Sequence, residues 1–218
     1  KLNFKKQVGD KIDLANATQR SMRHTRGNEI GMIFQEPMTA LNPVFTIGRQ
    51  LTEGLRLHKS LSKHQAKLRA IELLDQVRIP EPKNRLNQYP HELSGGMRQR
   101  VVIAMALACE PRLLIADEPT TALDVTIQAE ILSLIDRLKR ETGTAVMFIT
   151  HDMAVVAQMA DRVVVMYRGN KVEEGNVKDV FENPEHDYTK SLLAAVPKLG
   201  EMLGKKYPEP MKLLGENK

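Results

Sequence analysis

The sequence predicts an α/β protein that combines a mostly parallel sheet with a block of helices. The apolar run 113–116, which ends in two carboxylates, predicts a buried parallel strand. Residues 30–34 and 144–149 predict two further buried strands, because they are short, apolar and followed by polar residues. Residues 40–92 carry helical patterns interrupted by prolines, which predicts the block of helices.

Cap and turn signals place the remaining elements. Ser62 and Gln65 have the spacing of a capping box that opens a helix running to about residue 77. Thr126 is the predicted cap of a helix that runs to about residue 140. Further helices are expected over residues 18–25 and 46–59, and a hairpin over residues 161–174 with its turn at 168–170.

Length and composition are those of an ordinary soluble globular protein with one or two domains. The chain has 218 residues, of which 42% are hydrophobic and 27% are charged. No apolar run approaches the length needed to cross a bilayer, and no signal-peptide pattern opens the sequence. We therefore expect a cytoplasmic protein, unless a partner holds it at a membrane.

Charge and cysteine content exclude several kinds of site. The net charge of +5 could attract an anionic partner, but the basic residues are scattered among nearly as many acids. No basic cluster with interleaved aromatic residues occurs, so we expect no nucleic-acid binding. Cys109 is the only cysteine, which rules out an intramolecular disulfide and favours a small helix-packing residue.

The stretch from Leu93 to Glu118 predicts a site with two parts. It opens with Ser94-Gly95-Gly96, a polar cap and two glycines ahead of a long helical run. The bare N–H groups and the dipole of such a helix start attract phosphate, although for these three residues in isolation a simple helix cap is the favoured interpretation. At the other end, Asp117 and Glu118 follow a strand, at the sheet edge where open α/β proteins bind ligands.

The two carboxylates are suited to different roles. Asp117 and Glu118 are adjacent, so they cannot point the same way from one strand.

Gln35 follows the first predicted strand and could offer a neutral carbonyl to a metal ion or a water, although a lone glutamine is more often a surface residue. His151 follows the third predicted strand and could donate a hydrogen bond to a terminal phosphate.

Taken in order, these motifs resemble the nucleotide-binding domain of an ABC transporter. They match its Q-loop, signature motif, Walker B strand, D-loop and H-loop at Gln35, residues 93–100, 113–118 and 119–124, and His151. The resemblance implies a three-layer core of the P-loop NTPase type with a helical subdomain. The implied divisions are a first core part at 1–39, the helical subdomain at 40–110, a second core part at 111–197 and a tail or linker at 198–218.

The resemblance also implies ATP and Mg²⁺ as cofactors and a role for each motif residue. Gln35 and Asp117 would hold Mg²⁺, Glu118 would polarise the attacking water, and His151 would hold the γ-phosphate. Signature residues of the family close over a nucleotide that a second nucleotide-binding domain holds. That role would fall to Ser94, Gly95 and Gly96, with Asp124 bridging the dimer interface.

One motif of the family, the Walker A loop, is not found in these residues. The sequence contains no strand followed by Gly-x-x-x-x-Gly-Lys-[Ser/Thr], and the nearest approach, residues 200–206, lacks the spacing and the hydroxyl. In the family this loop precedes the Q-loop, so we expect an N-terminally incomplete fold. We further expect no ATP hydrolysis by the chain alone and an unpaired edge beside strand 144–149.

Two segments resemble one branch of the family. Residues 34–43 and 186–197 are similar to those of dipeptide, oligopeptide and nickel importers, and residues 22–202 are most similar to glutathione importers. The implied function is a partial ATPase subunit that energises peptide or glutathione uptake at the cytoplasmic face of the inner membrane. The implied partners are a second nucleotide-binding domain, the permease subunits and, indirectly, a solute-binding protein.

Two other functions remain open. The chain could be a non-catalytic interaction module that docks through its helical block, an interpretation that the missing Walker A loop favours. It could also be a soluble ABC ATPase that acts on DNA or ribosomes. Such proteins are expected to carry long coiled-coil insertions or a basic arm, which this sequence lacks.

Overall fold

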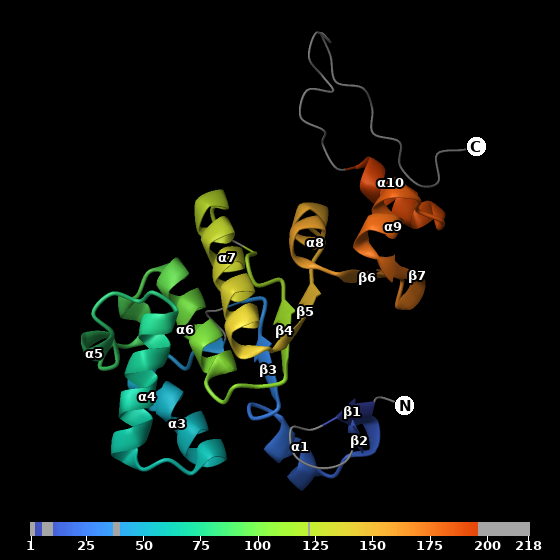
Figure 1. The fold of residues 1–218 in the computed structure, drawn as a ribbon. Coiled ribbons are helices and arrows are strands. Elements are labelled where there is room, and N and C mark those ends of the chain that lie inside the picture. Colours follow the sequence, from blue (N-terminus) through green and yellow to red (C-terminus); the bar gives the residue numbers. More distant parts are fainter. Residues whose placement is uncertain (1–2, 6–10, 37–39, 122, 196–218) are drawn as a thin grey trace. The chain divides into compact units, whose positions relative to one another are not determined.

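The computed structural model describes residues 3–5, 11–36, 40–121 and 123–195, and it divides the chain into two compact units (Figure 1). The first unit is Lys1–Ile149 and the second is Thr150–Lys218. The expected tail at 198–218 lies outside the described residues.

A parallel three-stranded sheet forms the centre of the first unit. Its order is β3 (Ile30–Ile33), β4 (Leu113–Asp117) and β5 (Ala145–Ile149). The register aligns the C-terminal ends of β4 and β5, so that Asp117 pairs with Ile149. The three predicted strands are therefore confirmed, and parallel pairing places the polar residues that follow β3 and β4 at one edge.

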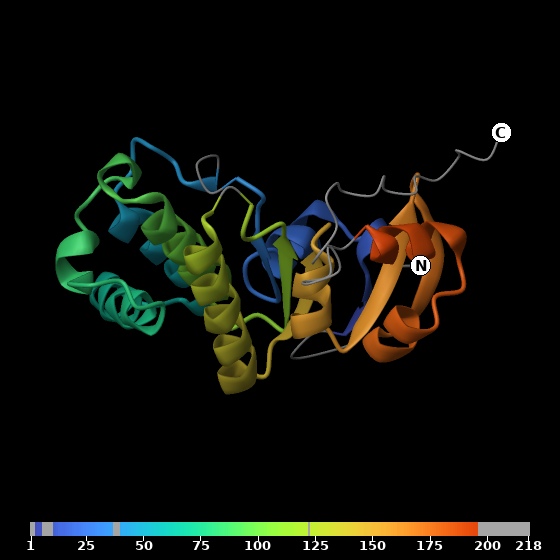
Figure 2. The same ribbon diagram turned by 90° about the horizontal axis from the view of Figure 1, so that it is seen from above.

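Helices cover one face of this sheet. Ile33, Leu114 and Ala116 are buried in one cluster with side chains of α6 (Gly95–Leu107) and α7 (Val125–Thr142). The two helices lie next to each other beside β4 (Figure 2). Alternate residues of a strand point to opposite faces. The strand neighbours of these three residues, such as Met32 and Ile115, therefore face away from α6 and α7.

The prediction of fully buried strands is wrong for the second face of the sheet. Met32 is 37% exposed, and Met147 and Ile149 are each 46% exposed. Apolar sequence alone predicts burial on both faces, whereas actual burial depends on what covers each face. Among the described residues, β5 pairs only with β4, which agrees with the expected unpaired edge.

We predict that the unpaired edge of β5 makes the 218-residue chain self-associate. Exposed strand N–H and C=O groups template pairing with another chain, and a lysine on such a strand opposes it. The variant Met147→Lys is therefore expected to shift the chain towards monomer in light-scattering measurements. Leu57→Lys, which changes an apolar residue that is 64% exposed on a helix, is the matched control. A monodisperse monomer for the unmodified chain would contradict this prediction.

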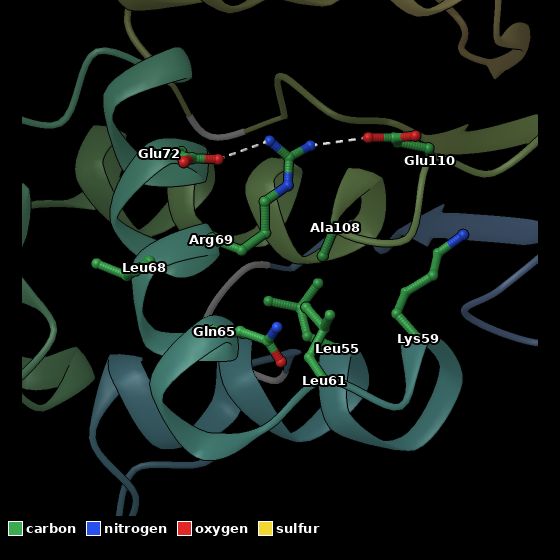
Figure 3. Close-up of a pocket in the computed structure, with 9 residues that line it drawn as sticks. All are labelled: Leu55, Lys59, Leu61, Gln65, Leu68, Arg69, Glu72, Ala108 and Glu110. Carbon is green, nitrogen blue, oxygen red and sulfur yellow. Dashed lines mark hydrogen bonds and ion pairs between the residues drawn. The ribbon is translucent and has the colours of Figure 1, made fainter.

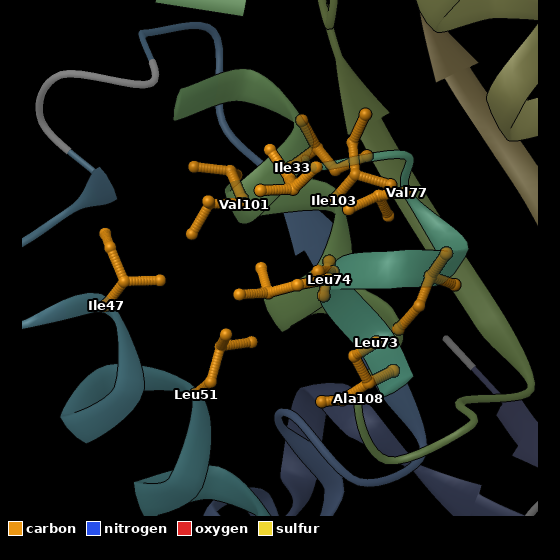
Figure 4. Close-up of a cluster of buried hydrophobic side chains, with 14 of the residues drawn as sticks. Ile33, Ile47, Leu51, Leu73, Leu74, Val77, Val101, Ile103 and Ala108 are labelled. Carbon is orange, nitrogen blue, oxygen red and sulfur yellow. The ribbon is translucent and has the colours of Figure 1, made fainter. Parts of the chain in front are cut away.

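The helical block consists of α3 (Ile47–Lys59), α4 (Lys63–Gln76), the single turn α5 (Pro82–Arg85), the short 3₁₀ helix η2 (Pro90–Glu92) and α6. Thr46 caps α3, and the predicted capping box at Ser62 and Gln65 is present at α4. Side chains from α3, α4 and α6, including Leu51, Leu74 and Ile103, form its buried core (Figure 4). The predicted helical block is therefore confirmed.

Two arginines fasten the C-terminal end of α4 to its neighbours. Arg100 on α6 donates to the carbonyl of Val77 at 2.9 Å and pairs with Glu130 of α7 at 2.6 Å. Arg137 on α7 donates to the carbonyl of Gln76 at 2.5 Å. Cations at a helix C-terminus complement the helix dipole and satisfy its last carbonyls. The end of α4 is thus tied to both α6 and α7.

Cys109 has the packing role expected from the sequence. It follows α6 and is 2% exposed, and burial raises the pKa of its thiol. A buried, protonated thiol is a poor nucleophile and a poor metal ligand. Cys109 is therefore part of the helical core.

The cap predicted for α7 is wrong. Asp124, not Thr126, is the N-cap, and its Oδ1 accepts from the N–H of Ile127 at 2.9 Å. The helix also continues to Thr142, where Gly143 ends it with a φ of +67°. Both Asp and Thr are good caps, so the choice depends on where the preceding loop leaves the extended conformation.

The start of the chain forms a small hairpin and a helix. The hairpin consists of β1 (Asn3–Lys5) and β2 (Lys11–Asp13), and the 3₁₀ helix η1 (Leu14–Asn16) follows it. The predicted short helix is α1 (Gln19–Thr25), with Thr18 as its cap. These elements precede β3.

The second unit contains α8 (Met153–Met159), β6 (Arg162–Tyr167), β7 (Asn170–Asn176), α9 (Val177–Glu182) and α10 (Asp187–Ala194). The predicted hairpin is confirmed, but its turn is two residues long. Arg168 and Gly169 both have positive φ, +49° and +80°, which matches the twist of a tight hairpin. None of the described helices has the length and apolar character that a membrane span requires.

Candidate functional site

The predicted site residues Gln35 and Glu118 meet in the structure. Nε2 of Gln35 donates to Oε2 of Glu118 at 2.9 Å, although 83 positions separate them in sequence. Thr121 also donates to this oxygen, with its hydroxyl 2.8 Å away. Two donors on one carboxylate oxygen hold the Glu118 side chain in place.

The sheet brings these residues together. Because β3 and β4 are parallel neighbours, with Ile33 paired to Ala116, the residues that follow them emerge at the same edge. Gln35 follows β3, and Asp117 and Glu118 lie at the end of β4. The end of β3 therefore supplies one polar group to this edge, and the end of β4 supplies two.

Glu118 has a strained backbone. Its φ is +44°, a left-handed conformation that non-glycine residues rarely adopt. Its N–H donates to the carbonyl of Ile149, at the end of β5, at 2.9 Å. This bond fixes the turn that follows Asp117. Strain of this kind persists only where neighbouring contacts determine the conformation, and it is common at functional sites.

Thr121 is a site residue that the sequence does not reveal. The residue lies in the turn after β4, and its partner is the carboxylate three positions earlier. A threonine in a polar turn gives no signal of this contact, because only the path of the turn decides which group its hydroxyl reaches.

The segment Ser94-Gly95-Gly96 begins α6 as predicted. Ser94 is the N-cap, and its hydroxyl oxygen accepts weakly from the N–H of Met97 at 3.4 Å. The first N–H groups of a helix have no partner within the helix, so the chemistry needed for anion binding is present. A Cβ on Gly96 would lie 3.3 Å from Ile127, whereas Gly95 has open space around it.

For Asp124 and His151, the roles expected from the sequence stay predictions. Asp124 caps α7, and the dimer contact expected for it stays a prediction. His151 belongs to the second unit, two residues after the end of β5. Its placement towards Glu118 therefore also stays a prediction.

The metal ligands suggested by the sequence are oxygen donors. Gln35 bonds to Glu118 through its amide nitrogen, so this contact does not engage its carbonyl oxygen. Asp117 is half-buried at the end of β4. Carboxylate and amide oxygens are the ligands that Mg²⁺ prefers. The described residues contain no group of three or more His, Cys, Asp or Glu that could hold a metal alone.

A separate pocket of about 520 Å³ lies in the helical block (Figure 3). Leu55, Leu61 and Ala108 are among its apolar lining residues, and Arg69 bridges Glu72 at 3.0 Å and Glu110 at 2.9 Å beside it. None of the predicted site residues lines it. The pocket is distinct from the cluster around Glu118.

Comparison with known proteins agrees with this arrangement. A family model described as ABC transporter matches residues 3–121, and one described as the C-terminal region of oligopeptide/dipeptide transporters matches residues 172–214. Among solved structures, a dimeric ATP-binding cassette in a post-hydrolysis state, bound to ADP and Pi, has a TM-score of 0.67 and 31% identity. The match covers 76% of this chain and 70% of the chain in that structure. The structure of cbiO1 from Clostridium perfringens, part of the ABC transporter complex cbiONQ, has a TM-score of 0.65 and 28% identity. This match covers 81% of this chain and 69% of the chain in that structure.

Curated relatives give higher identity. The glutathione import ATP-binding protein GsiA of Shigella dysenteriae serotype 1 is 57% identical over 98% of this chain, and that of Pectobacterium atrosepticum is 58% identical over the same share. The chain spans 34% of the length of these relatives. The predicted α/β fold of an ABC ATPase and the predicted importer branch are confirmed by these matches. The chain therefore belongs to the ABC transporter family.

Proposed function

We propose that this chain is part of the ATP-binding and ATP-hydrolysing subunit of an ABC importer. The observation that carries the proposal is the cluster at the end of β4, where Gln35 and Thr121 hold the carboxylate of Glu118. A glutamate held by neutral donors at a sheet edge is suited to orient a water and accept its proton. In this role Glu118 is the base, while Gln35 and Thr121 fix its rotamer.

ATP and Mg²⁺ are the proposed cofactors. Gln35 and Asp117 supply oxygen ligands of the kind that Mg²⁺ binds, and the metal would neutralise charge on the phosphates. His151 is proposed to donate a hydrogen bond to the γ-phosphate. Positioning and charge stabilisation provide most of the rate in phosphoryl transfer, so fixed donors and acceptors matter more here than covalent chemistry.

Ser94, Gly95 and Gly96 are proposed to act on a nucleotide that a second nucleotide-binding domain holds, with Asp124 at the interface. The exposure of Ser94 and Gly95 and the open space at Gly95 support this, because a phosphate can approach the backbone there. The subdomains are proposed to divide at residues 39, 110 and 197. The helical subdomain, residues 40–110, would then receive the permease subunits at the cytoplasmic face of the inner membrane.

Glutathione or a related peptide is the proposed solute. Supporting this are the 57–58% identity to proteins named for glutathione import and the match of residues 172–214 to oligopeptide/dipeptide transporters. The solute would reach the permease from a solute-binding protein, so its identity depends on those partners.

Transport by a reconstituted system tests the proposed function. The full-length protein that carries this sequence would be placed with its permease and solute-binding protein in vesicles, and the uptake of labelled glutathione, a dipeptide and nickel would be compared. We expect ATP-dependent glutathione or dipeptide uptake. ATP hydrolysis without uptake of any solute would instead support a soluble, non-transport ATPase.

A catalytically inactive interaction module is the second candidate. The absence of a Gly-x-x-x-x-Gly-Lys-[Ser/Thr] segment from these 218 residues favours it, because the β- and γ-phosphates would lack their main cradle. Nucleotide binding by the chain, measured beside the full-length protein, separates the two candidates.

A further inference from the structure

Gln99 is a buried polar residue on α6 that the proposed function leaves without a role. Its side chain is 1% exposed, and its Nε2 donates to the carbonyl of Pro119 at 2.5 Å. A carbonyl can only accept a hydrogen bond, so the NH₂ end of the Gln99 amide must face Pro119. The other end, Oε1, is buried and has no hydrogen-bond partner among the described residues. A half-satisfied buried amide is costly, so packing alone does not explain it.

Gln99 shares a helix face with the two glycines that begin α6. It lies four residues after Gly95 and three after Gly96, and such residues are neighbours along one side of a helix. This side packs on α7, since a Cβ on Gly96 would be 3.3 Å from Ile127. The phosphate-attracting start of α6 and the amide of Gln99 therefore belong to one rigid turn.

The acceptor of the Gln99 bond is one residue from the proposed base. Pro119 follows Glu118 directly, and the turn between them is held on its other side by the bond from the Glu118 N–H to Ile149. The Glu118 carboxylate is fixed by Gln35 and Thr121. The side chain of Gln99 thus joins α6, through one hydrogen bond, to the backbone that carries Glu118.

We propose that Gln99 is a positioning residue that couples the start of α6 to Glu118. A phosphate bound at the first turn of α6 fixes this helix, and the Gln99 amide then holds the Pro119 peptide so that Glu118 stays aligned. In this role Gln99 acts only through Glu118. This inference rests on the proposed function, because alignment of a base has an effect only where ATP is hydrolysed.

The test compares two buried glutamines in the full-length protein. Gln99→Met keeps the length of the side chain but removes the donor and the unpaired acceptor together. We expect kcat for ATP hydrolysis to fall at least about tenfold, because small misplacements of a catalytic group have large costs, with KM for ATP unchanged. The melting temperature should stay within about 3 °C.

Gln50→Met is the matched control. Gln50 is 8% exposed, and its amide bonds to Asn42 and Phe45 in the helical block, with both polar ends satisfied. Loss of the Gln50 amide should lower the melting temperature and leave kcat for ATP hydrolysis unchanged. A purely structural role for Gln99 predicts the same behaviour for both variants.

A second measurement asks whether Gln99 acts through Glu118. In a protein that already carries Glu118→Gln, adding Gln99→Met should lower the residual single-turnover rate no further. If Gln99→Met does not fold, Gln99→Asn replaces it, because the shorter amide stays polar but loses reach. Unchanged kcat in the folded variant, or an additive loss in the double variant, would overturn the inference. Absence of ATP hydrolysis by the unmodified protein would overturn the proposed function as well, so the two failures are distinguishable.

Discussion

Replacing Glu118 by glutamine is expected to lower kcat for ATP hydrolysis by the full-length protein about 10²–10⁴-fold. Glutamine keeps the shape of the side chain and can still accept from Thr121, so the fold of the site is preserved. It cannot accept a proton from water, which removes the chemical role proposed for this residue. Steady-state phosphate release measures the loss, and nucleotide binding is expected to be retained.

Glu110→Gln is the control for this prediction. Glu110 is also a glutamate, but its partner is the charged side chain of Arg69 in the helical block, at 2.9 Å. Its replacement should leave kcat unchanged. A Glu118→Gln variant that hydrolyses ATP at the unmodified rate would show that another group accepts the proton.

The 218-residue chain by itself is expected to bind ATP too weakly for calorimetric detection and to show no measurable turnover. The backbone donors and the lysine of a Walker A loop contact the β- and γ-phosphates, and these residues contain no such loop. The start of α6 does not replace it, because we propose that this segment acts on the nucleotide of another domain. The lack of a Walker A loop is the change with the largest predicted effect, since it removes ATP turnover entirely.

The full-length protein serves as the comparison and is expected to bind and hydrolyse ATP under the same conditions. Turnover by the purified 218-residue chain, lost on introducing Glu118→Gln, would contradict the expectation. Contaminating ATPases would not respond to this substitution, so the variant also serves as the control for purity.

The features predicted correctly from sequence are those with local causes. Thr46 and Ser62 mark the starts of α3 and α4 because their side chains cap N–H groups only three residues away. Apolar runs of strand length give β3, β4 and β5, and the parallel arrangement then places Gln35 and Glu118 at one edge. Their hydrogen bond follows from this topology.

The features that were missed depend on the tertiary path of the chain. Asp124 rather than Thr126 caps α7 because the preceding loop reaches its extended conformation at that residue. Met147 is exposed because no described helix of its unit covers its face of β5. Thr121 and Gln99 are recognisable only through the groups they reach, one of them a backbone carbonyl 20 positions away.

The two arginines at the end of α4 join this helix to both of its neighbours on that side. Arg100 of α6 and Arg137 of α7 hold the carbonyls of Val77 and Gln76, while Ala66 and Ala70 bury the first half of α4 in the core shared with α3 and α6. A force that a partner applies to α4 therefore reaches α6, the helix that begins with Ser94-Gly95-Gly96, without any change in the packing between them.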